Sequence, residues 1–201
     1  MSTKIFYVVL AIILVALSIF IYSRKSKSTI TPTTTASLSS LSVGPAPWQP
    51  EYKNLGSRLK AINLPLLGEE GTALHIHIHL DIFIDNKRVT VPTDIGIPTS
   101  GGVTPIHTHD TTGIIHIESP DAHASYTLNQ FIDIWGVKLT DTSIGGYNDN
   151  GSQKLIVYSN GNEISDPVNL PLIAHQEITI TYGTTQQKPT IAKSYQFPQG
   201  L

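Results

Sequence analysis

Residues 74–85 read LHIHIHLDIFID, and this stretch decides the fold. Its residues alternate strictly between two sides of an extended chain, which predicts a β-strand because successive strand side chains point to opposite faces. Branched apolar residues favour the same structure. One face of the strand is therefore apolar and suited to a core, and the other carries a row of imidazoles. The apolar set is Ile76, Ile78, Leu80, Ile82 and Ile84, and the second set is His75, His77, His79, Asp81, Phe83 and Asp85.

Further strands are expected on both sides of this segment. Asp85-Asn86-Lys87 has the composition of a turn, so residues 88–91 should return as the second arm of a hairpin. Asn160-Gly161 is a hairpin turn signal as well. The remaining extended segments are residues 105–109, 114–118, 155–159 and 177–182.

One helix is expected over residues 127–135, where four apolar residues recur at helical spacing. Thr127 and Gln130 can form a capping box, and Gly136 is placed to end the helix. Asp133 is expected to be a surface charge. The predicted fold is mainly β, an antiparallel sheet or sandwich-like arrangement with one short packed helix, preceded by an N-terminal transmembrane helix. The apolar stripe consists of Leu128, Phe131, Ile132 and Trp135.

The amino-acid composition leaves histidine and carboxylate side chains as the candidate metal ligands. The 201 residues suit one domain, and a net charge of -2 gives no basis for nucleic-acid binding. The chain has no Cys, which excludes disulfides, thiolate zinc sites, iron–sulfur clusters and cysteine nucleophiles. Met1 is the only methionine, so thioether copper(I) sites are excluded too.

The N-terminus predicts a membrane anchor. Residues 5–22 carry no charge and as a helix would span roughly 27 Å, the thickness of a hydrocarbon core. A cleaved signal peptide is the alternative, but its apolar region usually has about 7–15 residues, and residues 21–25 make a poor cleavage site.

The orientation signals conflict. Arg24, Lys25 and Lys27 follow the apolar run and favour a cytoplasmic domain by the positive-inside rule. Residues 28–46 read STITPTTTASLSSLSVGPA, which is typical of an extended stalk outside the cell. We expect an extracytoplasmic domain at the cell surface or in a periplasm. The expected organisation is an anchor at 1–27, a Ser/Thr/Pro-rich linker at 28–47, a histidine-rich β domain at 48–185 and a tail at 186–201.

Six histidines form the candidate metal site, because they recur at two-residue spacing or beside a carboxylate on predicted strands. Same-face strand neighbours are about 6.6–7 Å apart at Cα, so two such rings can converge on one ion. A third ring on one flat strand converges less easily and can serve another ion or support the site. Burying several imidazoles without a cation is costly. The candidate ligands are His75, His77, His79, His107, His109 and His116.

Three carboxylates accompany these histidines. Asp81 and Asp110 can accept the second ring N–H of a ligand histidine and fix its tautomer. Glu118 alternates with His116 and supports the same site. His123 lies in a polar loop and His175 begins a strand, so both are expected outside the centre.

This donor set predicts a divalent transition metal, copper or zinc first, with iron or nickel as further options. The first functional hypothesis is capture or transfer of copper(II) or zinc at a membrane, beside a transporter or an oxidase. The second is an enzyme that uses the ion for hydrolysis, hydration or redox chemistry, with Glu118, Asp110 or Asp81 as proton carrier. The third is a metal-free, pH-responsive surface that protonates near pH 6.

Three stretches resemble an uncharacterised family of membrane-anchored, histidine-rich bacterial and archaeal proteins. They are HIHIHLDIFIDNKRVTVPTDIGI (75–97), PIHTHDTTGIIHIESP (105–120) and YTLNQFIDIWGVKL (126–139). The resemblance covers most of residues 74–183 and implies that these segments belong to one domain. It implies no reaction or substrate.

Overall fold

A computed structural model describes residues 40–186 and 188–201, which belong to one compact unit. The predicted transmembrane helix and most of the predicted linker lie outside the described residues. Within the described part of the chain, no helix combines the length and the apolar character needed to cross a bilayer.

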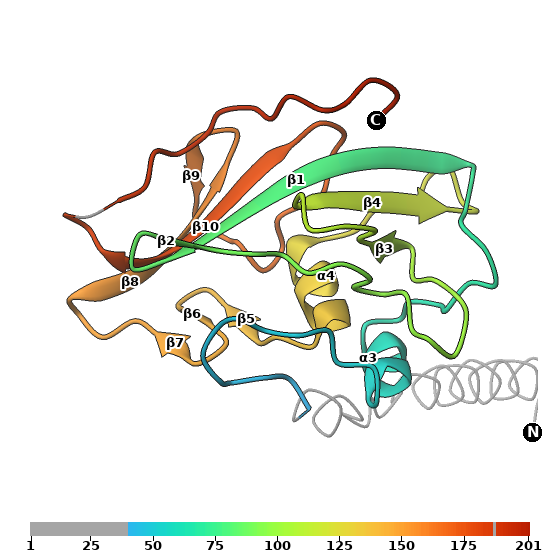
Figure 1. Cartoon of the computed structure of the whole chain (residues 1–201), viewed down its shortest axis with the longest axis horizontal. Coiled ribbons are helices and arrows are strands. Elements are labelled where there is room, and N and C mark those ends of the chain that lie inside the picture. The colour runs from blue at the N-terminus through green and yellow to red at the C-terminus, as the bar shows by residue number, and fades with distance from the viewer. Residues whose placement is uncertain (1–39, 187) are drawn as a thin grey trace, which may run out of the picture. The chain divides into compact units, whose positions relative to one another are not determined.

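The domain is mainly β, with short helices on one side of a curled sheet (Figure 1). The helices of the described residues are α3 (Leu55–Ala61) and α4 (Leu128–Trp135). The strands are β1 (Leu74–Ile84), β2 (Lys87–Val89), β3 (Ile106–His107), β4 (Ile114–Ser119), β5 (Leu139–Thr140), β6 (Ser143–Ile144), β7 (Tyr147–Asn148), β8 (Gln153–Ser159), β9 (Asn162–Ile164) and β10 (Glu177–Thr184).

The main sheet has the strand order β3-β4-β1-β10-β8-β9, with β2 paired to the far end of β1. β1 is antiparallel to β4 and parallel to β10. The sheet is therefore mixed, and the prediction of an antiparallel sheet was wrong at its central pair. Turn signals in a sequence predict hairpins, which pair strands that follow each other along the chain. The central pair instead places His79 opposite Glu177, which is 98 residues away, and no turn signal predicts such a pairing.

The core lies between the apolar face of β1 and helix α4. Ile78, Leu80 and Ile82 are fully buried, and Phe131 and Trp135 of α4 are equally buried against the same cluster. The predicted capping box is confirmed, because the Thr127 side chain accepts from the Gln130 backbone while the Gln130 side chain accepts from the Thr127 backbone. Gly136 ends the helix in the left-handed conformation, at φ 90°, as predicted.

The structure adds elements that the sequence did not signal. Helix α3 is a second helix beside the predicted one, and β5, β6 and β7 form a separate small sheet. Asp133 is buried, so its prediction as a surface charge was wrong. The reason is tertiary: buried Arg58 of α3 donates from Nε to the Asp133 carbonyl at 2.6 Å and ties the two helices together.

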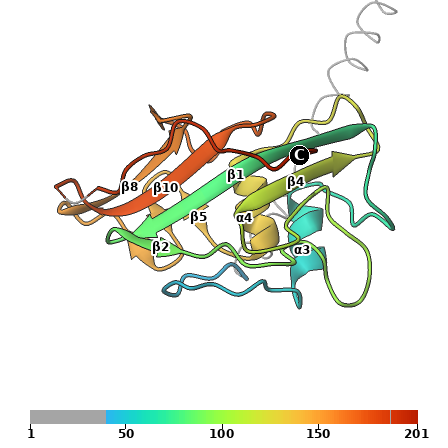
Figure 2. The ribbon, with the colours of Figure 1, turned by 45° about the horizontal axis from the view of Figure 1, so that its top comes forward.

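The histidine face of β1 is turned away from α4 and is crossed by the C-terminal residues, which run over the sheet from β10 toward β4 (Figures 1 and 2). The ring of Tyr195 stacks on His79 with centroids 3.7 Å apart and an interplanar angle of 6°. The ammonium of Lys188 donates to the Tyr158 hydroxyl at 3.2 Å. The sheet thus has a core on one face and a polar, partly covered second face.

Candidate metal centre

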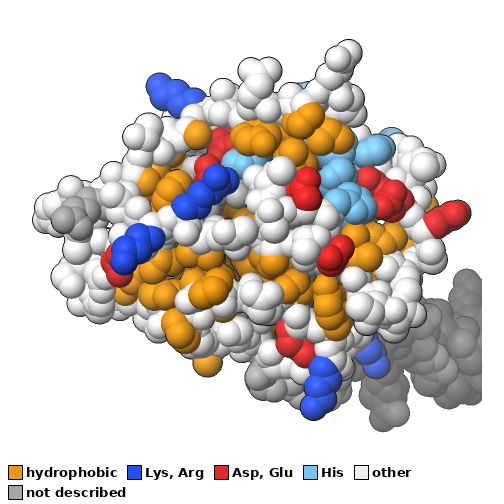
Figure 3. Space-filling model, viewed as in Figure 1, with side chains coloured by type: hydrophobic (Ala, Val, Ile, Leu, Met, Phe, Trp, Pro, Cys, Tyr) orange, Lys and Arg blue, Asp and Glu red, His pale blue; other side chains and the backbone are white. Residues whose placement is uncertain are grey.

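Strand register brings the histidines together at the β3-β4-β1 end of the sheet. His77 of β1 is directly opposite His116 of β4, and His107 of β3 is opposite the same His116 from the other side. His75 is opposite Glu118. Because paired residues share a face, three strands present their imidazoles to one place, and histidine and acidic side chains gather there on the surface (Figure 3).

A first donor group joins β1 and β4. His77 Nε2 lies 3.2 Å from His75 Nε2 and 3.1 Å from His116 Nδ1. Glu118 Oε1 lies 3.2 Å from His75 Nε2 and 3.4 Å from His116 Nδ1. These four atoms close a ring in which each lies beside two others. Two ligands bound to one zinc ion at about 2.0–2.1 Å with tetrahedral angles are about 3.3–3.4 Å apart, so the separations fit a shared ion.

Hydrogen bonding alone does not satisfy this group. A ring nitrogen carries either one proton or one lone pair in the ring plane, so it makes one such bond. His77 Nε2 faces two other ring nitrogens at hydrogen-bond distance. A cation placed among the rings would accept every lone pair at once. The convergence of nitrogens is therefore the arrangement that a metal ion requires.

A second donor group lies beside the first, on β3, the residues that follow it and the segment before β1. His107 Nε2 is 3.2 Å from His109 Nε2, and Glu70 Oε1 is 3.3 Å from His109 Nε2 and 3.8 Å from His107 Nε2. His107 Nδ1 donates to the Thr104 carbonyl at 2.9 Å, because a carbonyl only accepts. That bond fixes the tautomer and leaves the Nε2 lone pair free toward the cluster.

Burial keeps the central rings in the form that binds metal. Desolvation, followed by the neighbouring histidines, lowers the pKa of His116 to about 3, and desolvation lowers the pKa of His107 to about 4. The pKa of His77 is lowered for the same first reason. Burial and the charge of Glu70 raise the pKa of Glu118. At neutral pH the three rings are uncharged and their lone pairs are available.

His79 is separated from the cluster in spite of its place on β1. Its Nδ1 contacts Glu177 Oε2 at 2.7 Å, and its Nε2 donates to the Thr112 carbonyl at 3.1 Å. Both ring nitrogens are thus occupied, under the stacked ring of Tyr195. Asp81, Glu177 and His79 have donor atoms within 4.8 Å of one another, but Asp81 also pairs with Arg88 at 2.6 Å. Buried His79 and Glu177 therefore form a hydrogen-bonded pair, and partly exposed Asp81 pairs with Arg88 instead.

The other predicted residues lie at the margin. Asp110 accepts from the backbone and hydroxyl of Thr112, at 2.8 and 2.5 Å, and none of its hydrogen bonds within the described residues comes from a ring nitrogen. His123 is exposed. His175 is also exposed, with its ring 5.1 Å from that of Phe197.

Sequence reasoning missed two carboxylates. Glu70 lies in the GEEGT segment before β1, where no periodicity marks a side chain as facing the site. Glu177 alternates with Thr179 and Thr181 on β10, so the sequence could predict which face of the strand it is on. The sequence could not predict that β10 pairs with β1.

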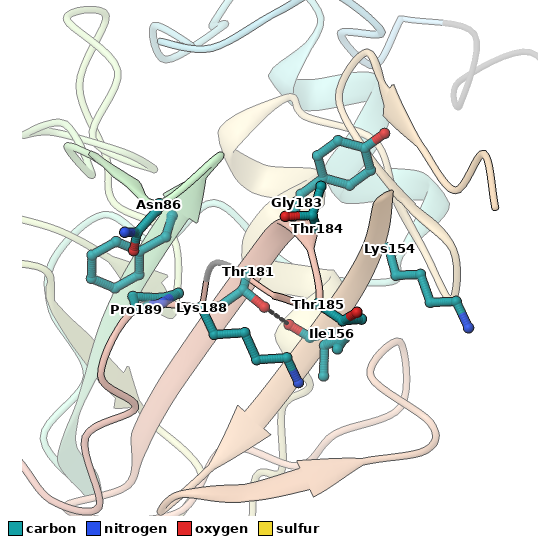
Figure 4. Close-up of a pocket in the computed structure, with 11 residues that line it drawn as sticks. Asn86, Lys154, Ile156, Thr181, Gly183, Thr184, Thr185, Lys188 and Pro189 are labelled. Carbon is teal, nitrogen blue, oxygen red and sulfur yellow. Dashed lines mark hydrogen bonds between the residues drawn. The ribbon is translucent and has the colours of Figure 1, made fainter. Parts of the chain in front are cut away.

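A small pocket lies at the opposite end of β1 (Figure 4). Phe83, Lys154, Thr181 and Lys188 line part of it. Six to eight strand residues separate Phe83 from His77 and His75, which is roughly 20–26 Å, so the pocket takes no part in the histidine centre.

Comparison with known proteins gives no further guide: the chain matches no protein family model, no curated protein and no solved structure.

Proposed function

We propose that this protein binds copper(II) or zinc through the His75, His77, His116 and Glu118 group, and captures or hands on the ion outside the cytoplasm. The observation that supports the proposal is the ring of donor atoms separated by 3.1–3.4 Å on two hydrogen-bonded strands. Sheet backbone holds these side chains before an ion arrives.

The donor chemistry supports the choice of metal. Imidazole nitrogens suit zinc, copper(II), nickel and iron(II), whereas copper(I) prefers the thiolate and thioether ligands that this chain lacks. Copper(II) ranks highest in affinity among divalent first-row ions at a given nitrogen or oxygen site. One carboxylate among three imidazoles also lowers the net charge of a bound divalent ion.

The decisive experiment is the metal content of the full chain, purified without a histidine tag in mild detergent and equilibrated with copper(II) or zinc. We expect near-stoichiometric metal, lost in a His75/His77/His107/His109→Ala variant. His123→Ala is the matched control, because it removes an exposed imidazole outside the cluster. A wild-type chain that takes up neither ion would end the proposal.

The location is a separate part of the proposal. The uncharged, Ser/Thr-rich residues 28–39 after the predicted anchor support an exposed stalk. A protease added to intact cells should release the domain by cutting in this stretch. Full protection in intact cells, with cutting after lysis, would assign the domain to the cytoplasm.

A metal-dependent hydrolase or hydratase is the second candidate, and side-chain exposure favours it. His75 is 51% exposed, His109 43% and Glu70 49%, so water reaches the donors. A metal-bound water acidified by the ion is the nucleophile of such enzymes. Turnover of activated esters or phosphoesters that requires metal and disappears in the His77→Ala variant would favour this candidate over transfer.

The metal-free, pH-responsive surface has less support. His107 and His116 have pKa values lowered to about 4 and 3, which puts their protonation well below pH 6.

A further inference from the structure

We infer that the histidine cluster is a dinuclear centre, which holds two metal ions bridged by Glu118. The inference rests on the proposed metal binding and adds the number of ions, their ligands and their order of loading. The inner site is defined as His75, His77, His116 and Glu118, and the outer site as His107, His109, Glu70 and the bridging Glu118.

The donors are too widely spread for one ion. Seven side chains, five imidazoles and two carboxylates, converge, yet they form two groups that share only His116 and Glu118 and do not merge within 4.8 Å. Ligands on opposite sides of one ion are about 4.1 Å apart when each bond is about 2.0–2.1 Å. One ion would leave one group of nitrogens without a cation.

Each group is complete enough to hold its own ion. The inner site offers four donors, each beside two others and all within 4.8 Å of one another. In the outer site, His107 Nε2, His109 Nε2 and Glu70 Oε1 form a closed triangle with sides of 3.2, 3.3 and 3.8 Å. Three protein ligands with one further position for a bridge or water are typical of an exchangeable site.

Glu118 is the residue placed to bridge. It belongs to both donor groups, and it is buried at 3% exposure. It is also near enough to Glu70, the carboxylate of the outer site, for the charge of Glu70 to raise the pKa of Glu118. A carboxylate has two oxygens and can bind one ion with each. Paired ions about 3.5–4 Å apart are the usual arrangement in dinuclear sites.

The two sites differ in access. Two ligands of the outer site, His109 and Glu70, have about half of their side-chain surface exposed, at 43% and 49%, whereas only His75, at 51%, is comparably exposed in the inner site. An open groove between residues 67–73 and Pro120 runs along the Glu70 side. The outer ion should therefore load second and leave first, which makes it the exchangeable ion of the pair.

The test counts ions in the full chain and measures whether they interact. Titration with copper(II) should end at two ions per chain by elemental mass spectrometry. The fully loaded protein should show a spin-coupled copper signal in electron paramagnetic resonance. Glu70→Gln combined with His109→Ala, both at exposed positions, should reduce the count to one and restore an uncoupled single-copper signal. His75→Ala should instead weaken the inner ion, and His123→Ala should change nothing.

The outcomes separate the two proposals. One ion per chain at saturation, with unchanged content in the Glu70/His109 variant, would overturn the dinuclear centre and leave metal binding intact. Two ions without spin coupling in the wild type would overturn the Glu118 bridge. No bound ion would contradict both proposals.

Discussion

At the scale of single residues, the same side chain has different roles at adjacent positions of one strand. His77 directs Nε2 at two other ring nitrogens, whereas His79, two residues on, has both nitrogens engaged by Glu177 and Thr112. The difference comes from the neighbouring strand: His77 faces β4, which carries His116, and His79 pairs in register with Glu177 of β10.

This contrast predicts different effects of two alanine substitutions. His77→Ala removes a nitrogen from the centre of the inner site. Removing a residue that only supports a metal ligand already lowers metal affinity about 10–100-fold, so loss of the ligand itself should weaken binding by at least about tenfold. His79→Ala should keep the metal and instead lower thermal stability, because Glu177 would stay buried without its partner. Isothermal titration with zinc and thermal unfolding measure the two effects. Equal metal loss in both variants would contradict the division of roles.

Asp133 predicts a change of stability with pH. Burial raises its pKa to about 7, above the unfolded value of 3.8. The folded state therefore binds more protons between these values, and the stabilisation is lost as pH rises through about 7. We expect the free energy of unfolding to fall by about 1 kcal/mol between pH 6 and 8 from this group alone.

Asp133→Asn should remove that decrease. The new amide keeps an oxygen that can accept from Asn129 Nδ2, as the Asp133 carboxylate does at 2.9 Å. Urea unfolding at pH 6 and pH 8 measures the slope of stability for both proteins. A wild-type slope that persists in the variant would show that another group titrates.

At the scale of elements, sequence and structure agree where the signal is local. The alternation of residues 74–85 fixed β1 and its two faces, and the spacing of apolar residues fixed α4 with both of its ends. A period-two pattern indicates which face a side chain is on but not which strand is its neighbour, so the sequence did not establish that β3, β4 and β1 are adjacent. Three features depend on contacts between distant segments, so no sequence pattern predicted them. They are the parallel pairing of β1 with β10, the short helix α3 and the position of Glu70.

The packing of the segment before β1 positions Glu70 in the outer site. A Cβ on Gly71 would lie 2.2 Å from the Ser119 backbone carbon, so Gly71→Ala must push this segment off the end of β4. Glu70 would move with it, away from His109. We expect a loss of about 1–3 kcal/mol in stability and a weaker second ion, with the first ion retained.

Gly68→Ala is the matched control, because nothing lies within 4 Å of a Cβ at that position. Copper titration and urea unfolding of both variants provide the comparison. An unchanged outer site in the Gly71 variant would show that Glu70 is positioned independently of the packing on Ser119.

At the scale of the whole molecule, the neutral cluster makes the metal-free protein sensitive to acid. His107 and His116 have folded pKa values of about 4 and 3 and an unfolded value of 6.5, so the unfolded chain binds more protons between these limits. The free energy of unfolding should be unaffected by these groups above about pH 6.5 and should fall as pH drops toward 4.

Asp133 changes stability in the opposite direction over part of this range, so the measurement belongs in the Asp133→Asn background. Urea unfolding in the presence of a chelator at pH 7.5 and pH 5 should show the loss. Stability that stays level between these values would mean that the rings are not held neutral in the fold.

The pairing of β1 with β10 also sets the order of assembly during synthesis. Contacts between residues 98 apart give the central pair a high contact order, and such pairings form late. A growing chain therefore leaves one edge of β1 unpaired until nearly all residues have been made, while β2 and β4 can already pair with the other edge and bring the imidazoles of β1 and β4 together. Stray ions can reach these rings before the sheet closes, so the maturing chain needs either scarce free metal or a delay in loading until the last strand is in place.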